Sequence, residues 1–197
     1  MKRVIRWAAL ALMLMPAMVT AQDFQAGRAA YEAGDYATAL REWRPLAEQG
    51  DAAAQFNLGV MYANGQGVPQ DDAEAMKWYR LAAAQGIAAA QYDLGVMYHS
   101  GQGVPQDDAE AVKWYRLAAA QSYAKAQSNL GFMYGKGQGV PQDFIAAHMW
   151  FNISGANGDS QAAAKRDAVA AKLSPADLST AQRSAKVCMA SNYRDCD

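Results

Sequence analysis

The most suggestive chemical motif in the sequence is Ser122-x-x-Lys125. Ser-x-x-Lys is the spacing at which serine β-lactamases use a lysine to help activate a nucleophilic serine. No Lys-Thr-Gly segment follows it, however, and Ser122 stands where Gly86 and Gly158 stand 36 residues before and after it. We therefore expect Ser122 to be a turn residue, and a hydrolase acting on β-lactams or cell wall is the weakest of three functional hypotheses.

Other groups of polar residues could hold a ligand, but their spacing favours structural roles. Gly65-x-Gly67 lacks the third glycine and the lysine of a phosphate-binding loop, and helix termination explains it better. The aspartate pairs at 71–72 and 107–108 lack the spacing of a calcium loop, and helix capping explains them. The two histidines lie 49 residues apart without an arrangement of carboxylates. We predict no catalytic residue, no metal ion and no cofactor.

The two cysteines, Cys188 and Cys196, lie close together near the end of the chain. In an oxidising compartment such a pair predicts a disulfide, whose nine-residue loop contributes roughly 2–3 kcal/mol of stability. The alternative is a metal or redox pair. The spacing fits neither Cys-x-x-Cys chemistry nor a zinc knuckle, and no histidine is near.

The first 21 residues have the pattern of a secretory signal peptide. Lys2, Arg3 and Arg6 precede an apolar segment from Trp7 to Met15, and small residues precede a cleavage position after Ala21. An uncleaved anchor is the alternative, but the apolar segment is short against the ~20 residues that span a bilayer. No cysteine follows it, so we do not expect a lipoprotein anchor.

The charge left after cleavage bears on the partner and the compartment. The chain has 18 basic and 19 acidic residues, and cleavage removes three basic ones, so the remaining 176 residues carry a charge of −4. A mildly acidic chain argues against nucleic acid as a partner. Because no other apolar segment approaches spanning length, we expect a soluble periplasmic or secreted product.

A tandem repeat of 36 residues dominates the sequence. Residues 52–87 and 88–123 share 29 of 36 positions, and residues 124–159 form a third, more divergent unit. In the first unit we expect a helix from about Ala52 to Ala63, the loop GQGVPQD, and a second helix that Asp71 and Glu74 begin with a capping box. The second unit repeats this pattern, whereas Ala146 replaces the glutamate in the third and weakens the cap.

The segments on either side of these units complete the organisation. Residues 22–51 predict a shorter first unit of two helices with a tighter turn, and residues 160–197 predict C-terminal capping helices. One of these is expected over 160–173, and Ser174-Pro175 begins the next. With the signal peptide at 1–21, this predicts one all-α domain of about ten helices.

Two sets of recurring residues predict how the helices pack. Gly59 and its equivalents lie within a helix, where glycine costs about 1 kcal/mol, so their recurrence indicates close helix approach. The tryptophans at Trp78, Trp114 and Trp150 recur at a fixed position of the second helix. We expect them in the core rather than stacked on sugars.

The motif AxxxLGxMYxxGxGVPQDxxxAxxWxxxAAxxG recurs three times between Ala54 and Gly158, with Ser122 in place of its last glycine in the second copy and Ser154-Gly155 in place of its paired alanines in the third. In this it resembles the Sel-one-like (Sel1-like) repeat family, relatives of the tetratricopeptide repeat, and the shorter first unit looks like an ordinary tetratricopeptide. The resemblance implies a right-handed α-solenoid of antiparallel helix pairs with a concave binding surface. It also implies a scaffold or adaptor role. Exported bacterial relatives are linked to envelope signalling, periplasmic control and host contact. Some secreted members with a β-lactamase label carry cysteine pairs within each repeat, which these repeats lack.

Positions that differ between the three units indicate which side binds. On the first helix of each unit they fall mostly on one face, opposite the repeated positions. In tetratricopeptide-like solenoids that helix lines the concave surface, so we expect these residues to be exposed there and to contact a partner. The predicted partner-binding residues are Phe56, Asn57, Tyr92, Asp93, His99, Ser128, Asn129 and Lys136. Neutral drift, and partial burial of Phe56 and Tyr92 between units, are the alternatives.

The sequence therefore predicts an exported scaffold that binds a protein partner on its concave face. A peptidoglycan- or glycan-binding envelope module is the second hypothesis, because surface aromatics stack on sugars. The identity of the partner and the oligomeric state are left open by these patterns.

Overall fold

The structure is a computed structural model that describes residues 23–194 and 196. The predicted signal peptide lies outside the described residues. The described part is all-α, as predicted, and contains ten helices and no strand. The helices are α1 (Phe24–Glu32), α2 (Tyr36–Glu48), α3 (Ala52–Asn64), α4 (Asp72–Ala84), α5 (Ala88–Ser100), α6 (Asp108–Ala119), α7 (Ala124–Lys136), α8 (Phe144–Ala156), α9 (Ala162–Ala170) and α10 (Pro175–Ala190).

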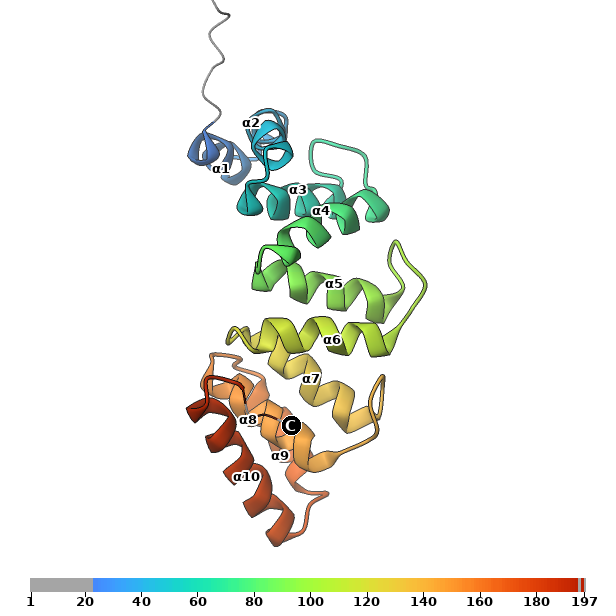
Figure 1. The fold of residues 1–197 in the computed structure, drawn as a ribbon, viewed down its shortest axis with the longest axis vertical. Coiled ribbons are helices and arrows are strands. Elements are labelled where there is room, and N and C mark those ends of the chain that lie inside the picture. The colour runs from blue at the N-terminus through green and yellow to red at the C-terminus, as the bar shows by residue number, and fades with distance from the viewer. Residues whose placement is uncertain (1–22, 195, 197) are drawn as a thin grey trace, which may run out of the picture.

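The helices form a solenoid of stacked pairs. Each helix of a unit packs on its partner, as α3 does on α4 and α5 on α6, and each pair also contacts the next. Figure 1 shows the units following one another along the long axis, with the loops 65–71, 101–107 and 137–143 on one edge. A single pair cannot cover its own apolar stripe, so stacking buries it. No helix of the described part is long and apolar enough to cross a membrane.

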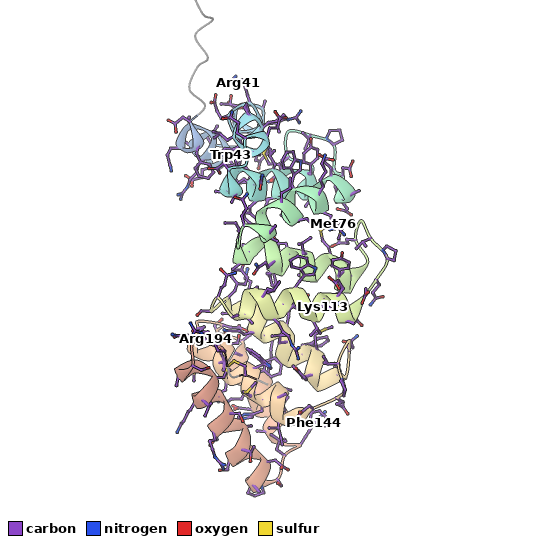
Figure 2. All side chains as sticks on the ribbon, in the orientation of Figure 1. Arg41, Trp43, Met76, Lys113, Phe144 and Arg194 are labelled. Carbon is purple, nitrogen blue, oxygen red and sulfur yellow. A yellow bond between two sulfur atoms is a disulfide. The ribbon has the colours of Figure 1, made fainter. Side chains whose placement is uncertain are left out.

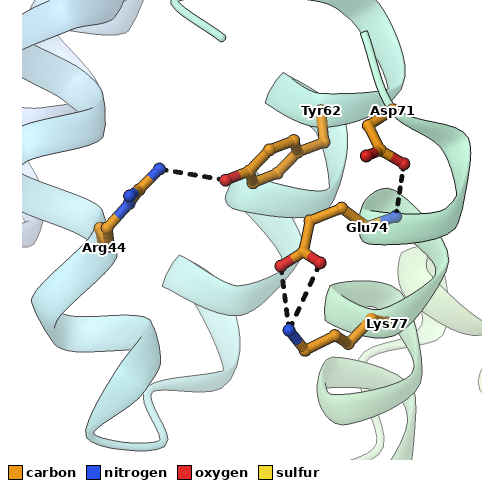
Figure 3. A network of polar contacts seen from close by, with 5 residues as sticks. All are labelled: Arg44, Tyr62, Asp71, Glu74 and Lys77. Atoms are coloured by element: carbon orange, nitrogen blue, oxygen red, sulfur yellow. Dashed lines mark hydrogen bonds and ion pairs between the residues drawn. The ribbon is translucent and has the colours of Figure 1, made fainter. Parts of the chain in front are cut away.

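Aspartates begin most of the helices. The side chain of Asp71 accepts a hydrogen bond from the backbone N–H of Glu74 at 2.9 Å, as predicted (Figure 3). The second half of the predicted capping box is wrong, because the Glu74 carboxylate accepts from Lys77 instead. The Asp71 N–H donates to the Tyr62 carbonyl at 3.0 Å, so it needs no capping side chain. Each such N-cap contributes about 1 kcal/mol.

Glycines end the first helix of each repeat. Gly65, Gly101 and Gly137 adopt the left-handed conformation with φ between 66° and 72°. In this conformation a residue with Cβ is strained, so the predicted role of Gly65 in helix termination is confirmed.

The mid-helix glycines lie against aromatic rings, as their recurrence predicted. A Cβ at Gly59 would lie 2.5 Å from ring atoms of Tyr79, and one at Gly95 would lie 2.5 Å from Tyr115. The third repeat has the same arrangement between Gly131 and Phe151. The missing side chain therefore lets the paired helices of one unit approach closely.

The repeated tryptophans lie mostly in the core. Trp78 and Trp150 are buried and Trp114 is half-buried. Their indole N–H groups have no hydrogen-bond partner within the described residues. Trp43 of the first unit is buried between α1 and α2 and donates to the Phe24 carbonyl at 3.1 Å (Figure 2). The buried rings of Trp43, Trp78 and Trp150 are not available to stack on a sugar.

Polar side chains also recur between units, in two series that the sequence analysis did not anticipate. The first is a ladder of buried glutamines, in which each amide donates to a backbone carbonyl of the preceding helix. These bonds run from Gln55 to Ala47, from Gln91 to Ala83 and from Gln127 to Ala119, at 3.0–3.2 Å. The second joins an arginine of one unit to a tyrosine hydroxyl of the next, as from Arg44 to Tyr62 at 3.0 Å (Figure 3). Both series fix the spacing of successive units.

The C-terminal helices close the end of the solenoid. Helix α9 is shorter than the predicted 160–173, because residues 171–173 form a turn that leads to the Ser174 N-cap of α10. Helix α10 packs back against α8. The predicted disulfide joins Cys188, which is fully buried, to Cys196.

Candidate binding surface on the first helices of the repeats

The predicted partner-binding residues lie on α3, α5 and α7, the first helices of the three repeats. These helices are stacked along the long axis in Figure 1. Most of the predicted side chains are half-buried rather than fully exposed. For Phe56 and Tyr92 this agrees with the alternative of partial burial between units. Lys136 is exposed.

The expectation of exposure is wrong for Ser128. Only 4% of this residue is accessible, because α9 lies over it and Lys165 Nζ donates to its hydroxyl at 2.8 Å. The repeat comparison could not show this, since α9 has diverged too far to be recognised as the next first helix of the series.

Aromatic rings form the floor of the surface. Phe56 lies against Tyr79 with ring centroids 5.8 Å apart. One repeat later, Tyr92 lies against Tyr115 at 5.9 Å and also against Tyr123 at 5.2 Å. Ring pairs at these distances attract each other and hold the side chains in place, so the surface has apolar groups in fixed positions before a partner binds.

Asp93 places a carboxylate among these rings. It has neither a hydrogen bond nor an ion pair with any other described residue. Burial raises the pKa of Asp93 to about 6, and the charge of Lys125 only partly opposes this. In the neighbouring repeats the same position holds the neutral amides Asn57 and Asn129. A desolvated carboxylate without a partner is unfavourable in the free protein, and a cationic or hydrogen-bonding partner would stabilise it.

Asn129 connects the second repeat to the third. Hydrogen bonding from its side chain lowers the pKa of the Tyr92 and Tyr115 hydroxyls, but burial acts in the opposite direction and is the larger effect. The net pKa of both tyrosines is raised, so they are neutral hydrogen-bonding groups at physiological pH.

His99 and Lys136 lie further along the surface, and both are close to the ring of Phe132. Nδ1 of His99 lies 2.6 Å from the Asp108 carboxylate, and its ring meets Phe132 edge-on at 6.3 Å. Lys136 Nζ lies 6.0 Å from the centre of the same ring. Phe132 is 43% exposed, so this end of the surface combines an accessible aromatic ring with a cation.

Comparisons with known proteins agree with this geometry. The profile of the family described as Sel1 repeat matches residues 52–87, 88–123 and 124–159. These matches cover more than half of the chain.

The chain belongs to the Sel1 repeat family.

Two solved structures of Sel1 proteins are similar to it. A Sel1 repeat protein from Oxalobacter formigenes is 35% identical with a TM-score of 0.70, over 73% of this chain and 59% of that one. The second is c5321, described as a protective antigen present in uropathogenic Escherichia coli strains with an SLR fold. It is 42% identical with a TM-score of 0.68, over 71% of this chain and 31% of that one. The chain thus spans less than two thirds of both. A search of curated proteins found no significant match.

Sel1 repeats are generally non-enzymatic scaffolds for protein–protein interaction. Ser122, the serine of the Ser-x-x-Lys motif, is exposed and has a positive φ of 64°, as Gly86 and Gly158 have positive φ of 88° and 103°. It therefore occupies the left-handed turn position that the repeat requires. No three metal-ligating side chains gather anywhere in the part of the chain that the structure describes.

Sequence reasoning missed a cavity of about 260 Å³ between α7, α8 and α9. Its walls include Phe144, Lys165 and Lys172, none of which was singled out. A signal was present: Lys165 and Lys172 lie 72 residues, or two repeats, after Asp93 and Ser100. A larger cavity, of about 570 Å³, lies between α8 and α10.

Proposed function

We propose that this Sel1 protein is an exported scaffold that binds a partner protein along the first-helix side of its repeats. The observation that carries the proposal is Asp93, a carboxylate set among aromatic rings without a hydrogen bond or ion pair to any residue that the structure describes. Interfaces characteristically combine buried aromatic anchors with a few polar groups that become paired on binding.

The neighbouring groups support protein binding over glycan binding. Phe56 and Tyr92 are half-buried and are each followed in the chain by a polar residue, Asn57 and Asp93, so this side combines partly exposed aromatic rings with an amide and a carboxylate. The tryptophans, whose rings would stack best on sugars, are mostly in the core. We therefore place the peptidoglycan- or glycan-binding alternative second.

The disulfide between Cys188 and Cys196 supports an oxidising compartment. With the signal peptide predicted at 1–21, it favours the periplasm or the outside of the cell. Release of a chain that begins at Gln22 into the periplasmic or culture fraction would support this location, and retention in the cytoplasm would contradict it.

Crosslinking in living cells, followed by purification of the tagged full-length protein, tests the proposed function. A second bait carries Phe56→Ala, Tyr92→Ala and Asp93→Ala, and a control bait carries Lys77→Ala and Lys113→Ala, which change exposed residues of α4 and α6. We expect a discrete partner that disappears only with the first altered bait. Recovery of cell-wall fragments, with no protein above background, would reject the scaffold and favour glycan binding.

A further inference from the structure

The cavity between α7, α8 and α9 has a composition unlike the rest of the surface. Three lysines line it, Lys136, Lys165 and Lys172, together with Phe132 and Phe144, and none of its lining residues is acidic. Phe144, at the start of α8, is labelled in Figure 2. The whole chain has a formal charge of −1, so three lysines around one small cavity are a marked local excess of positive charge.

Two of the three lysines have no anionic partner in the part of the chain that the structure describes. Lys172 Nζ lies 4.7 Å from the centre of the Phe144 ring, and Lys136 Nζ lies 6.0 Å from that of Phe132. Neither forms an ion pair with a described residue. Lys165 differs, because it is 3.8 Å from Asp159 and donates to Ser128. The aromatic rings hold Lys136 and Lys172 at the cavity while leaving their charges unneutralised.

The cavity is a modified copy of one found two repeats earlier. The equivalent cavity, of about 190 Å³, lies between α3, α4 and α5 and is lined by Asn64, Asp72 and Asp93. Addition of 72 to these numbers gives Lys136, Phe144 and Lys165. The cavity between α7, α8 and α9 therefore lacks both carboxylates of the earlier cavity and has lysines at two of the three equivalent positions.

We propose that the cavity between α7, α8 and α9 binds an acidic segment of a partner protein that inserts one aromatic or aliphatic side chain. The side chain packs between Phe132 and Phe144, and flanking carboxylates pair with Lys136 and Lys172. This inference rests on the proposed function and adds the chemistry of the partner. Charge-assisted pairs at the rim of an apolar pocket supply specificity for acidic sequences.

Fluorescence anisotropy with a defined peptide tests this inference on the full mature chain. The probe is fluorescein-labelled Gly-Ser-Glu-Glu-Phe-Glu-Glu-Gly-Ser-Gly, blocked at both ends. Matched peptides replace every Glu by Gln, every Glu by Lys, or the Phe by Ala. We expect saturable binding of the Glu peptide, weaker binding of the Ala peptide, and loss of binding with rising salt as the charges are screened. Equal binding of the Glu and Gln peptides, or no binding up to about 1 mM, overturns the proposal.

Substitutions that install residues found at the equivalent positions of other repeats change the cavity, and we expect them to preserve the fold. Lys136→Asn with Lys172→Ser installs the residues found at 64 and 100, and Phe144→Asp installs the aspartate of the first two repeats. We expect each variant to weaken the Glu peptide by roughly tenfold or more, because two ion pairs or the apolar wall are lost. The control, Lys77→Asn with Lys113→Ser, removes the same charge from α4 and α6.

Binding that survives the cavity variants, or falls equally with the control, would show that the lysines of the cavity are not the acidic-peptide site. The crosslinking experiment separates the two proposals. A partner lost from the bait altered at Phe56, Tyr92 and Asp93 but retained by the Lys136→Asn, Lys172→Ser bait would leave the scaffold function intact and reject this cavity as its acidic-segment site.

Discussion

Asp93→Asn is expected to stabilise the free protein at neutral pH. Burial raises the pKa of Asp93 from 3.8 to about 6 in the folded chain, so folding favours the protonated carboxyl. The stability gained from protonation is complete below pH 4 and is lost as the pH rises to about 6. At about 1.4 kcal/mol for each pH unit, the ionised carboxylate costs on the order of 2–3 kcal/mol at pH 7. Asparagine is accepted at this position, because Asn57 and Asn129 occupy it in the neighbouring repeats.

Urea denaturation followed by circular dichroism, between pH 4 and pH 7.5, measures this effect. The variant should have a higher unfolding midpoint at pH 7, and the difference from the native chain should shrink towards pH 4. Glu48→Gln, at an exposed glutamate on α2, makes the same change of charge and should shift stability by less than about 0.5 kcal/mol. A variant no more stable than the native chain at pH 7, or a difference independent of pH, would refute the assignment of an unfavourable buried charge.

Three further substitutions and one chemical treatment test the packing and the C-terminal end of the solenoid. Gly95→Ala should destabilise the protein by about 2 kcal/mol, because its Cβ would meet the buried Tyr115 ring at 2.5 Å, and the loss exceeds the helix-propensity gain. Gly135→Ala, whose Cβ would lie 3.6 Å from its nearest neighbour, should instead be neutral or stabilising in the same urea titration. Ser122→Gly should raise stability by about 1 kcal/mol, because φ of 64° favours glycine; a loss of stability in thermal unfolding contradicts this. Reduction of the disulfide should lower stability by roughly 2–3 kcal/mol, and equal melting temperatures with and without dithiothreitol would show that the C-terminal loop adds nothing.

Most of the fold could be predicted because the residues that begin, end and pack the helices recur at the same position of each repeat. Gly59, Gly95 and Gly131 recur at a position where only a close helix contact explains a glycine, and the structure shows that contact. The end of α9 was less predictable, because residues 160–173 have lost the loop motif that marks helix boundaries elsewhere. The capping box was predicted wrongly because the backbone N–H of Asp71 already donates to the Tyr62 carbonyl, which leaves Glu74 to pair with Lys77. That contact joins two helices and cannot be predicted from the local sequence.

The sequence predicted which residues line the candidate surface but not how far each side chain is exposed to solvent. Differences between repeats located Asp93 and Lys136, because a comparison within one chain separates packing positions from free ones. They could not show that Ser128 is covered, since α9 covers it from outside the three compared units. Lys165 and Lys172 of the cavity were missed for the same reason, because they lie on α9 and just after it.

The near-identity of the repeats creates a problem of register that these departures solve. A partner that contacted only positions shared by residues 52–87 and 88–123 would fit equally well one repeat up or down the solenoid, since 29 of 36 positions are the same. Asp93 has no acidic equivalent at Asn57 or Asn129, and Lys136 has no basic equivalent at Asn64 or Ser100. A partner that pairs with both can bind in one register only, because a shift by one repeat in either direction places a neutral asparagine opposite the group that pairs with Asp93. Asp93, whose ionised carboxylate disfavours the free protein, is therefore also one of the residues that would give the complex its specificity.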